Sequence, residues 1–127
     1  MAAEHLDQSS WPSLAESLAQ QLGGLRDGQF VTLEAPSGAF VQARSLGPGL
    51  YLECVGSTSF GGGYPWDAVA EEALAALGWT RETQFGNAVY RADVLIDASA
   101  AAAGILVPTL RDVAGVADPA VLTVSMG

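Results

Sequence analysis

The chain has 127 residues, of which half are hydrophobic and 15% are charged, and its 14 acidic residues face five arginines and no lysine. This length fits a single domain with one core, and the composition is the opposite of that of a disordered chain. The formal net charge is −9, and the five arginines are scattered along the sequence. We therefore expect the chain to bind neither nucleic acid nor an anionic membrane surface.

The remaining composition favours a cytoplasmic protein. The single cysteine, Cys54, has no second cysteine in the chain for a disulfide, and the acidic start lacks the basic and then apolar pattern of a secretion signal. The longest apolar stretch, Ala98 to Leu110, is shorter than the roughly 20 residues that cross a bilayer. It also contains Gly104 and Pro108, so we do not expect it to span a membrane.

A first helix is predicted at about Trp11 to Leu22, after a flexible tail over residues 1–8. Ser9, Ser10 and Ser13 offer hydroxyl caps, Ser13 and Glu16 have the spacing of a capping box, and Gly23-Gly24 supplies a stop. The large apolar residues recur at steps of three and four and form one stripe: Trp11, Leu14, Leu18, Leu22 and Leu25.

Three strands are predicted next, because β-favouring residues alternate between short turns that contain glycine and proline. Their ranges are Gln29 to Ala35, Ala39 to Ser45 and Leu50 to Val55. Short turns of this kind join antiparallel neighbours. The glycine-rich segment Gly56 to Gly63 then interrupts the pattern.

A second helix is predicted over Pro65 to Leu77, with Gly78 as its C-terminal cap. Its predicted apolar face consists of Trp66, Val69, Ala70, Ala73, Leu74 and Leu77. Two strands, Trp79 to Phe85 and Ala88 to Val94, flank the hairpin turn Gly86-Asn87.

A third helix is predicted between a cap at Asp97 and an end at Gly115, with a kink or a restart at Pro108, since an internal proline removes a hydrogen bond. Ala120 to Val124 can add a short C-terminal edge strand. The order helix, three strands, helix, two strands, helix indicates one α+β domain over residues 1–127, in which helices back a twisted antiparallel sheet.

The sequence contains no recognisable catalytic or metal-binding pattern, so no catalytic residue, metal or cofactor is predicted. The only histidine, His5, lies in the predicted tail, and one histidine with one cysteine cannot form a zinc site. Glu71 and Glu72 are adjacent on a helix and do not face each other, which favours a solvated surface. Gly61-Gly62-Gly63 lacks the lysine and hydroxyl residues of a phosphate loop.

Strand alternation predicts two different faces for the sheet of the first three strands. One face is apolar and forms the core: Val31, Leu33, Ala35, Ala39, Val41, Ala43, Leu50, Leu52 and Cys54. Cys54 is therefore expected to be buried and inert. The other face mixes aromatic and polar groups: Phe30, Thr32, Glu34, Phe40, Gln42, Arg44, Tyr51, Glu53 and Val55.

This second face has two interpretations. It is either an ordinary half-polar sheet surface, with Gln42 opposite Glu53 and Arg44 opposite Tyr51, or a dimer or peptide surface. In the second case the anchors are Phe30, Phe40 and Tyr51, and the groups that can hydrogen-bond a partner's backbone are Gln42 and Glu53. The other location considered for a binding site is the second helix with the segment Gly56 to Gly63.

Several short pieces, in their order and spacing, resemble the TY-Chap domain family, which is related to type III secretion chaperones and to the YbjN family. They are Trp11-Pro12-Ser13-Leu14 with Leu18 and Leu22; Phe40-Val41-Gln42; Leu52-Glu53; Leu77-Gly78-Trp79; and Thr109 to Val116 followed by Asp118-Pro119. The resemblance covers nearly the whole chain. It implies the secretion-chaperone fold, a tendency to dimerise and a role in binding peptides, in a family found mostly in actinobacteria.

Three functions are therefore weighed. The leading hypothesis is a non-enzymatic, chaperone-like module that binds a protein or peptide and acts as a homodimer. The second is a small-molecule sensor or an orphan enzyme with a carboxylate-lined pocket, and the third is a structural subunit of a larger assembly.

Overall fold

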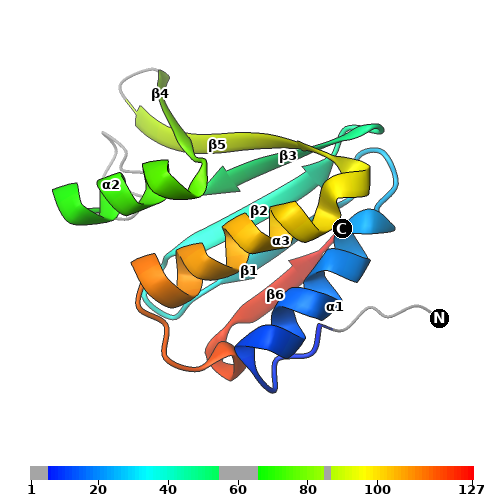
Figure 1. Ribbon diagram of the computed structural model, residues 1–127, viewed down its shortest axis with the longest axis horizontal. Coiled ribbons are helices and arrows are strands. Elements are labelled where there is room, and N and C mark those ends of the chain that lie inside the picture. The colour runs from blue at the N-terminus through cyan, green and yellow to red at the C-terminus, as the bar shows by residue number, and fades with distance from the viewer. Residues whose placement is uncertain (1–5, 55–65, 85–86) are drawn as a thin grey trace.

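The computed structural model describes residues 6–54, 66–84 and 87–127 of the chain. Within these residues the fold is α+β, with one six-stranded antiparallel sheet in the strand order β4-β5-β3-β2-β1-β6. Figure 1 shows α1 and α3 lying over the same face of the sheet and α2 at one end. The longer elements are α1 (Trp11–Gly23), β1 (Phe30–Glu34), β2 (Phe40–Ser45), β3 (Gly49–Cys54), α2 (Ala68–Leu77), β4 (Thr80–Gln84), β5 (Asn87–Leu95), α3 (Ser99–Pro108) and β6 (Thr123–Met126).

Helix α1 begins and ends within one residue of its predicted bounds, and one of the predicted hydroxyl caps is used. The N-cap is Ser10, whose hydroxyl oxygen accepts a hydrogen bond from the backbone N–H of Ser13. The predicted capping box of Ser13 with Glu16 is therefore wrong, because the helix already starts three residues earlier. The predicted leucine stripe is confirmed, since Leu14, Leu18 and Leu22 are all fully buried.

The predicted tail over residues 1–8 needs a correction from residue 6 onward. The side chain of Leu6 is only 7% exposed and belongs to the core. The side-chain amide of Gln8 donates hydrogen bonds to the carbonyls of Pro119 and Leu122, both at 2.9 Å. A buried leucine and two long-range hydrogen bonds tie this segment to the C-terminal part of the chain, while residues 1–5 lie outside the described residues.

The predicted inner face of the first three strands is confirmed in full. Its nine residues, from Val31 to Cys54, are all buried, and they pack against the leucines of α1 and the apolar residues of α3. The predicted register is confirmed as well, because Gln42 pairs with Glu53 and Arg44 pairs with Tyr51. The two hairpins therefore keep simple pairing, and the alternation of side chains continues across all three strands.

Helix α2 differs most from its prediction. It begins at Ala68, because Asp67 caps it by accepting the backbone N–H of Ala70 at 2.7 Å, and Pro65 lies outside the described residues. Leu74 is its only buried residue, whereas Val69, predicted to lie on the apolar face, is 77% exposed. Gly78 ends the helix with a φ of 113°, as the predicted glycine cap requires.

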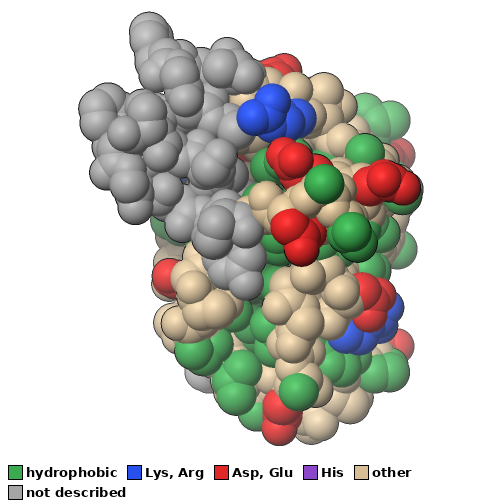
Figure 2. Space-filling view, turned by 90° about the vertical axis from the view of Figure 1, so that its left-hand side faces the viewer, with side chains coloured by type: hydrophobic (Ala, Val, Ile, Leu, Met, Phe, Trp, Pro, Cys, Tyr) green, Lys and Arg blue, Asp and Glu red, His purple; other side chains and the backbone are tan. Residues whose placement is uncertain are grey.

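The side of the molecule on which α2 lies is shown in Figure 2. Acidic and hydrophobic side chains intermingle there, with few basic groups among them. The following hairpin also needs a correction, since Asn87 belongs to β5 and pairs with Gln84. The predicted turn Gly86-Asn87 is therefore wrong at Asn87, and Gly86 lies outside the described residues.

The third helix changes form at Pro108, where a kink or restart is predicted. Helix α3 ends at Pro108 and continues directly into a π-helical turn, Thr109–Val113, in which the N–H of Ala114 donates to the carbonyl of Thr109 at 2.9 Å. The helix therefore changes form at the residue directly after Pro108, whose missing N–H leaves one helical hydrogen bond unmade. Asp97 makes no capping hydrogen bond, because it lies inside a 3₁₀ turn, Ile96–Ala98, that precedes α3.

The predicted C-terminal edge strand is present, with shifted bounds. A 3₁₀ turn, Pro119–Val121, occupies the start of the predicted range, and β6 runs from Thr123 to Met126. It pairs with β1 in antiparallel orientation and forms one edge of the sheet.

Two hydrogen bonds of the Thr109 hydroxyl join the π-helical turn to Trp79, the residue before β4, and to α3. The indole N–H of Trp79, whose side chain is buried, donates to the hydroxyl oxygen of Thr109 at 2.8 Å. The same hydroxyl donates to the carbonyl of Ile105 at 2.7 Å. Thr109 thus satisfies a buried indole and adds a bond to a helix carbonyl next to Pro108.

Replacing Thr109 with valine should lower the free energy of unfolding by about 1–3 kcal/mol, because it leaves the buried indole N–H without an acceptor. Thr109→Ser keeps the hydroxyl and should cost less. Urea denaturation followed by circular dichroism measures both variants, and Thr123→Val on exposed β6 serves as the control. Equal midpoints for Thr109→Val and Thr109→Ser would show that the hydroxyl does not stabilise the fold.

Candidate partner-binding face

The outer face is the side of the sheet opposite the helices, and it continues across the strands β5-β3-β2-β1. Pairing places Arg91 beside Glu53, Glu53 beside Gln42, and Gln42 beside Thr32. A second row runs through residues of the same four strands: Asp93, Tyr51, Arg44 and Phe30. Because directly paired residues of antiparallel strands share a face, these side chains all lie on the outer face.

The five predicted site residues all lie on this face, and each is half-buried: Phe30, Phe40, Gln42, Tyr51 and Glu53. Gln42 and Glu53 are direct cross-strand neighbours. Phe30 and Tyr51 stand on either side of Arg44, which pairs with both. Phe40 pairs with Glu34. The structure thus brings the predicted group together on one surface.

Arginines lie over two of the three aromatic rings. The guanidinium carbon of Arg44 is 5.3 Å from the centre of the Phe30 ring, and that of Arg91 is 5.0 Å from the centre of the Tyr51 ring. Cation–π contacts of this length hold a ring and a guanidinium against each other. Burial, and then the charge of Glu53, raise the pKa of Tyr51, so its phenol stays neutral.

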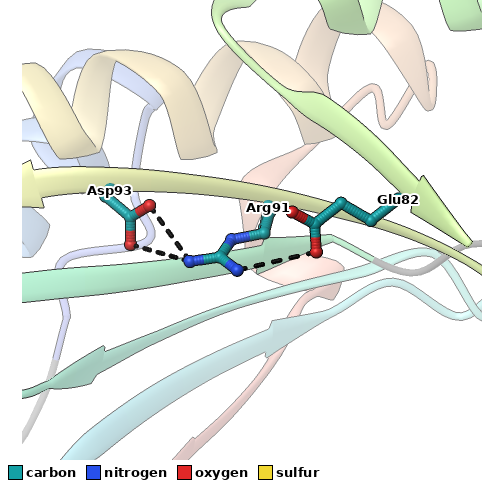
Figure 3. Close-up of polar contacts among 3 residues, drawn as sticks. All are labelled: Glu82, Arg91 and Asp93. Atoms are coloured by element: carbon teal, nitrogen blue, oxygen red, sulfur yellow. Dashed lines mark hydrogen bonds and ion pairs between the residues drawn. The ribbon is translucent and has the colours of Figure 1, made fainter. Parts of the chain in front are cut away.

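Arg91 is held by two carboxylates as well as by the ring. Figure 3 shows it between Glu82 of β4 and Asp93 of its own strand, with nitrogen–oxygen distances of 3.5 Å and 3.2 Å. Asp93, and then Glu82, raise the pKa of Arg91 above its already high value. All three groups are partly exposed, so the cluster orients Arg91 more than it stabilises the fold.

Sequence reasoning did not find Arg91, Glu82 and Asp93 as parts of this face. Alternation places Arg91 and Asp93 on the same side of β5, but it does not say which strand lies next to β5. That neighbour is β3, which is separated from β5 in sequence by α2 and β4. The contact of Arg44 with Phe30 could have been predicted from the sequence, because both residues belong to the first predicted hairpin.

A separate pocket of about 350 Å³ lies between α2 and the inner side of β4 and β5. The phenol of Tyr90 donates to the carboxylate of Glu71 at 2.7 Å, and Arg81 lies 3.5 Å from the same carboxylate. Burial and Glu71 raise the pKa of Tyr90 to about 12. Glu71 therefore attaches α2 to the sheet and is not simply solvated as predicted, whereas Glu72 is exposed.

No group of three or more histidine, cysteine, aspartate or glutamate residues could hold a metal ion in the part of the chain that the structure describes. Among the same residues, no helix is long and apolar enough to cross a membrane.

The fold and the outer face define the chain as a small α+β domain whose sheet has a partly aromatic face that no helix covers among residues 6–54, 66–84 and 87–127. Over residues 4–126 it matches the family described as T3SS (YopN, CesT) and YbjN peptide-binding chaperone 3. The chain belongs to this family, which confirms the resemblance to TY-Chap domains. No curated protein and no solved structure matches it.

Cys54 should be almost unreactive toward thiol reagents in the folded protein. It is buried, and burial followed by the charge of Glu53 raises the pKa of its thiol from 9.0 to about 12. The reactive thiolate is therefore scarce at pH 8, and alkylation should be at least about a hundredfold slower than in denaturant. Labelling followed by mass spectrometry measures one site, since the chain has one cysteine. Equal rates in both conditions would contradict the prediction.

Proposed function

We propose that the protein is a non-enzymatic, chaperone-like module that binds a protein or peptide partner through the outer face and acts as a cytoplasmic homodimer. One observation supports this most directly: the sheet face opposite the helices carries three half-buried aromatic side chains, Phe30, Phe40 and Tyr51. Membership of a family of peptide-binding chaperones agrees with a polypeptide as the partner.

The arrangement of this face suits the capture of an extended chain. Phe30 and Tyr51 supply flat apolar area, and Arg44 and Arg91 hold their rings in place, so that less freedom is lost on binding. Gln42 and Glu53 lie side by side at the centre and offer a donor and acceptors for a partner's backbone. Aromatic residues with neighbouring polar groups are typical of binding hot spots.

The pocket beside α2 supports a second candidate, a small-molecule sensor. It brings a carboxylate, a guanidinium and a phenol together in the groups of Glu71, Arg81 and Tyr90. These groups already satisfy one another, and a phenol with a pKa of about 12 is a poor base at neutral pH, so we rank catalysis below binding. A thermal-shift screen against metabolites tests this candidate, because a specific ligand raises the melting temperature.

Co-purification from the native host followed by mass spectrometry distinguishes the leading proposal from the third candidate, a structural subunit. A peptide-binding module should co-purify with partner proteins that are present in smaller molar amounts than the module itself. A structural subunit should instead be recovered with the same neighbours in fixed proportion. A recovery of the chain alone would count against both.

The first prediction of this proposal is the oligomeric state. Multi-angle light scattering at micromolar concentration should give twice the mass of the 13.0 kDa chain. The physical reason is that association covers apolar area on the outer face. A mass of one chain over the whole accessible concentration range would rule out the homodimer.

The second prediction concerns the anchors. Phe40→Ser and Tyr51→Ser should each weaken dimerisation or partner capture by about tenfold or more, because interface aromatics contribute strongly to binding. Sedimentation equilibrium and quantitative pull-down measure the two effects separately, and circular dichroism checks the fold. Thr32→Ser, on the same face, is the matched control. If both aromatic variants assemble and capture partners as the wild type does, the binding site lies elsewhere.

A further inference from the structure

A groove of about 320 Å³ runs between α2 and the π-helical turn Thr109–Val113. It lies on the helix side of the sheet, because α2 contacts the inner side of β5 through Glu71 and Tyr90. Most of its lining is apolar and comes from Trp66, Val69, Ala70, Ala73 and Val113, with the carboxylates of Asp67 and Asp112 as its polar groups. Its volume is at the lower end of the range for small binding sites.

The apolar lining is incompletely covered by the chain itself. Val69 is 77% exposed, more than any other large hydrophobic residue that the structure describes. It sits in the first turn of α2, where Ala70 and Ala73 are only partly buried. An apolar groove that a helix leaves at the surface is typical of an interaction site.

The charge around the groove indicates what can bind there. Asp112 forms an ion pair with Arg111, whose guanidinium donates to both carboxylate oxygens at 2.9 Å and 2.8 Å and lowers the pKa of Asp112. The charge of Asp112 is thus largely compensated. Asp67 and the exposed Glu72 add further acidic groups from the same helix and its cap. Figure 2 shows this side as hydrophobic groups set among acidic ones. These local acidic groups attract a basic segment of a partner.

We propose that this groove is a second docking site, separate from the outer face, and that it binds a hydrophobic side chain flanked by arginine or lysine in a partner polypeptide. The apolar lining removes the partner's central side chain from water. The carboxylates of Asp67 and Glu72 attract the flanking cations and raise the association rate, and Asp112 keeps Arg111 paired so that it does not repel them. The two sites lie on opposite sides of the sheet, so one partner can occupy the groove while the outer face is engaged.

Fluorescence anisotropy tests the proposal with three short fluorescein-labelled peptides. One has a central leucine pair flanked by arginines, one has the same leucines flanked by glutamates, and one has serines flanked by arginines. Only the first should bind well, and its affinity should fall as salt rises, because ions screen exposed charges. Equal binding of the first and third peptides would overturn the proposal, since it would show charge attraction without use of the apolar groove.

Variants of the groove locate the binding. Val69→Ser should lower the affinity for the first peptide by roughly tenfold, because it removes exposed apolar contact area without disturbing the core. Asp67→Asn and Asp112→Asn should each weaken it by about two- to threefold at low salt only, since exposed charge pairs contribute little and are screened. Asparagine caps a helix as well as aspartate does, so Asp67→Asn changes the charge and keeps α2.

Matched controls are Val121→Ser, on another exposed valine, and Asp27→Asn, in the segment between α1 and β1 at the far end of the molecule from α2 (Figure 1). Both should bind the peptide as the wild type does. Phe40→Ser should also bind it normally, which separates this proposal from that of the outer face. If Phe40→Ser fails to bind the peptide while Val69→Ser binds it normally, the proposed groove site is wrong and the peptide binds to the outer face.

Discussion

The two-residue period of the strands is the constraint on which the rest of this structure depends. Val31, Val41 and Leu52 lie on three neighbouring strands and are buried on one face of the sheet. The residues next to each of them along its own strand must then lie on the opposite face. Burying nine apolar side chains of three strands under α1 and α3 therefore forces Phe30, Gln42 and Tyr51 onto the opposite face. The candidate partner-binding face follows from the core, and a slip of one residue in any hairpin would exchange the two.

This dependence explains how much could be predicted from the sequence. Hairpins formed by neighbouring strands have short turns, so the pairs Gln42–Glu53 and Arg44–Tyr51 follow from local chain geometry. The pairing of β3 with β5 joins residues across α2 and β4, and local patterns carry no information on it. Arg91 was missed for that reason, although its own strand was predicted. Gln8 was assigned to a tail because its hydrogen-bond partners, Pro119 and Leu122, lie more than a hundred residues away in sequence.

Helix α2 shows a different limit of sequence reasoning. Its apolar residues repeat with helical spacing, which predicts one buried face, yet periodicity does not say how much sheet is available to cover that face. The helix lies at the end of the sheet, where Leu74 enters the core and Glu71 contacts Tyr90 and Arg81. The apolar pattern of α2 predicts that packing alone holds the helix against the sheet. In the structure the polar contacts of Glu71 also hold it there, and Val69 stays at the surface.

The outer face and the α2 groove are both surfaces on which no described helix packs. Helices α1 and α3 pack on one side of the sheet, so among the described residues no helix covers the outer face, and none covers Val69 of α2. The two surfaces differ in charge. On the outer face Arg44 lies between aromatic residues and Arg91 lies between acids. The α2 groove is bordered by Asp67 and by Asp112, which is paired with Arg111. A mixed face can pair with a second copy or an uncharged strand, but an acidic groove selects a basic segment. Charge pattern therefore assigns different partners to two surfaces that the packing alone leaves equivalent.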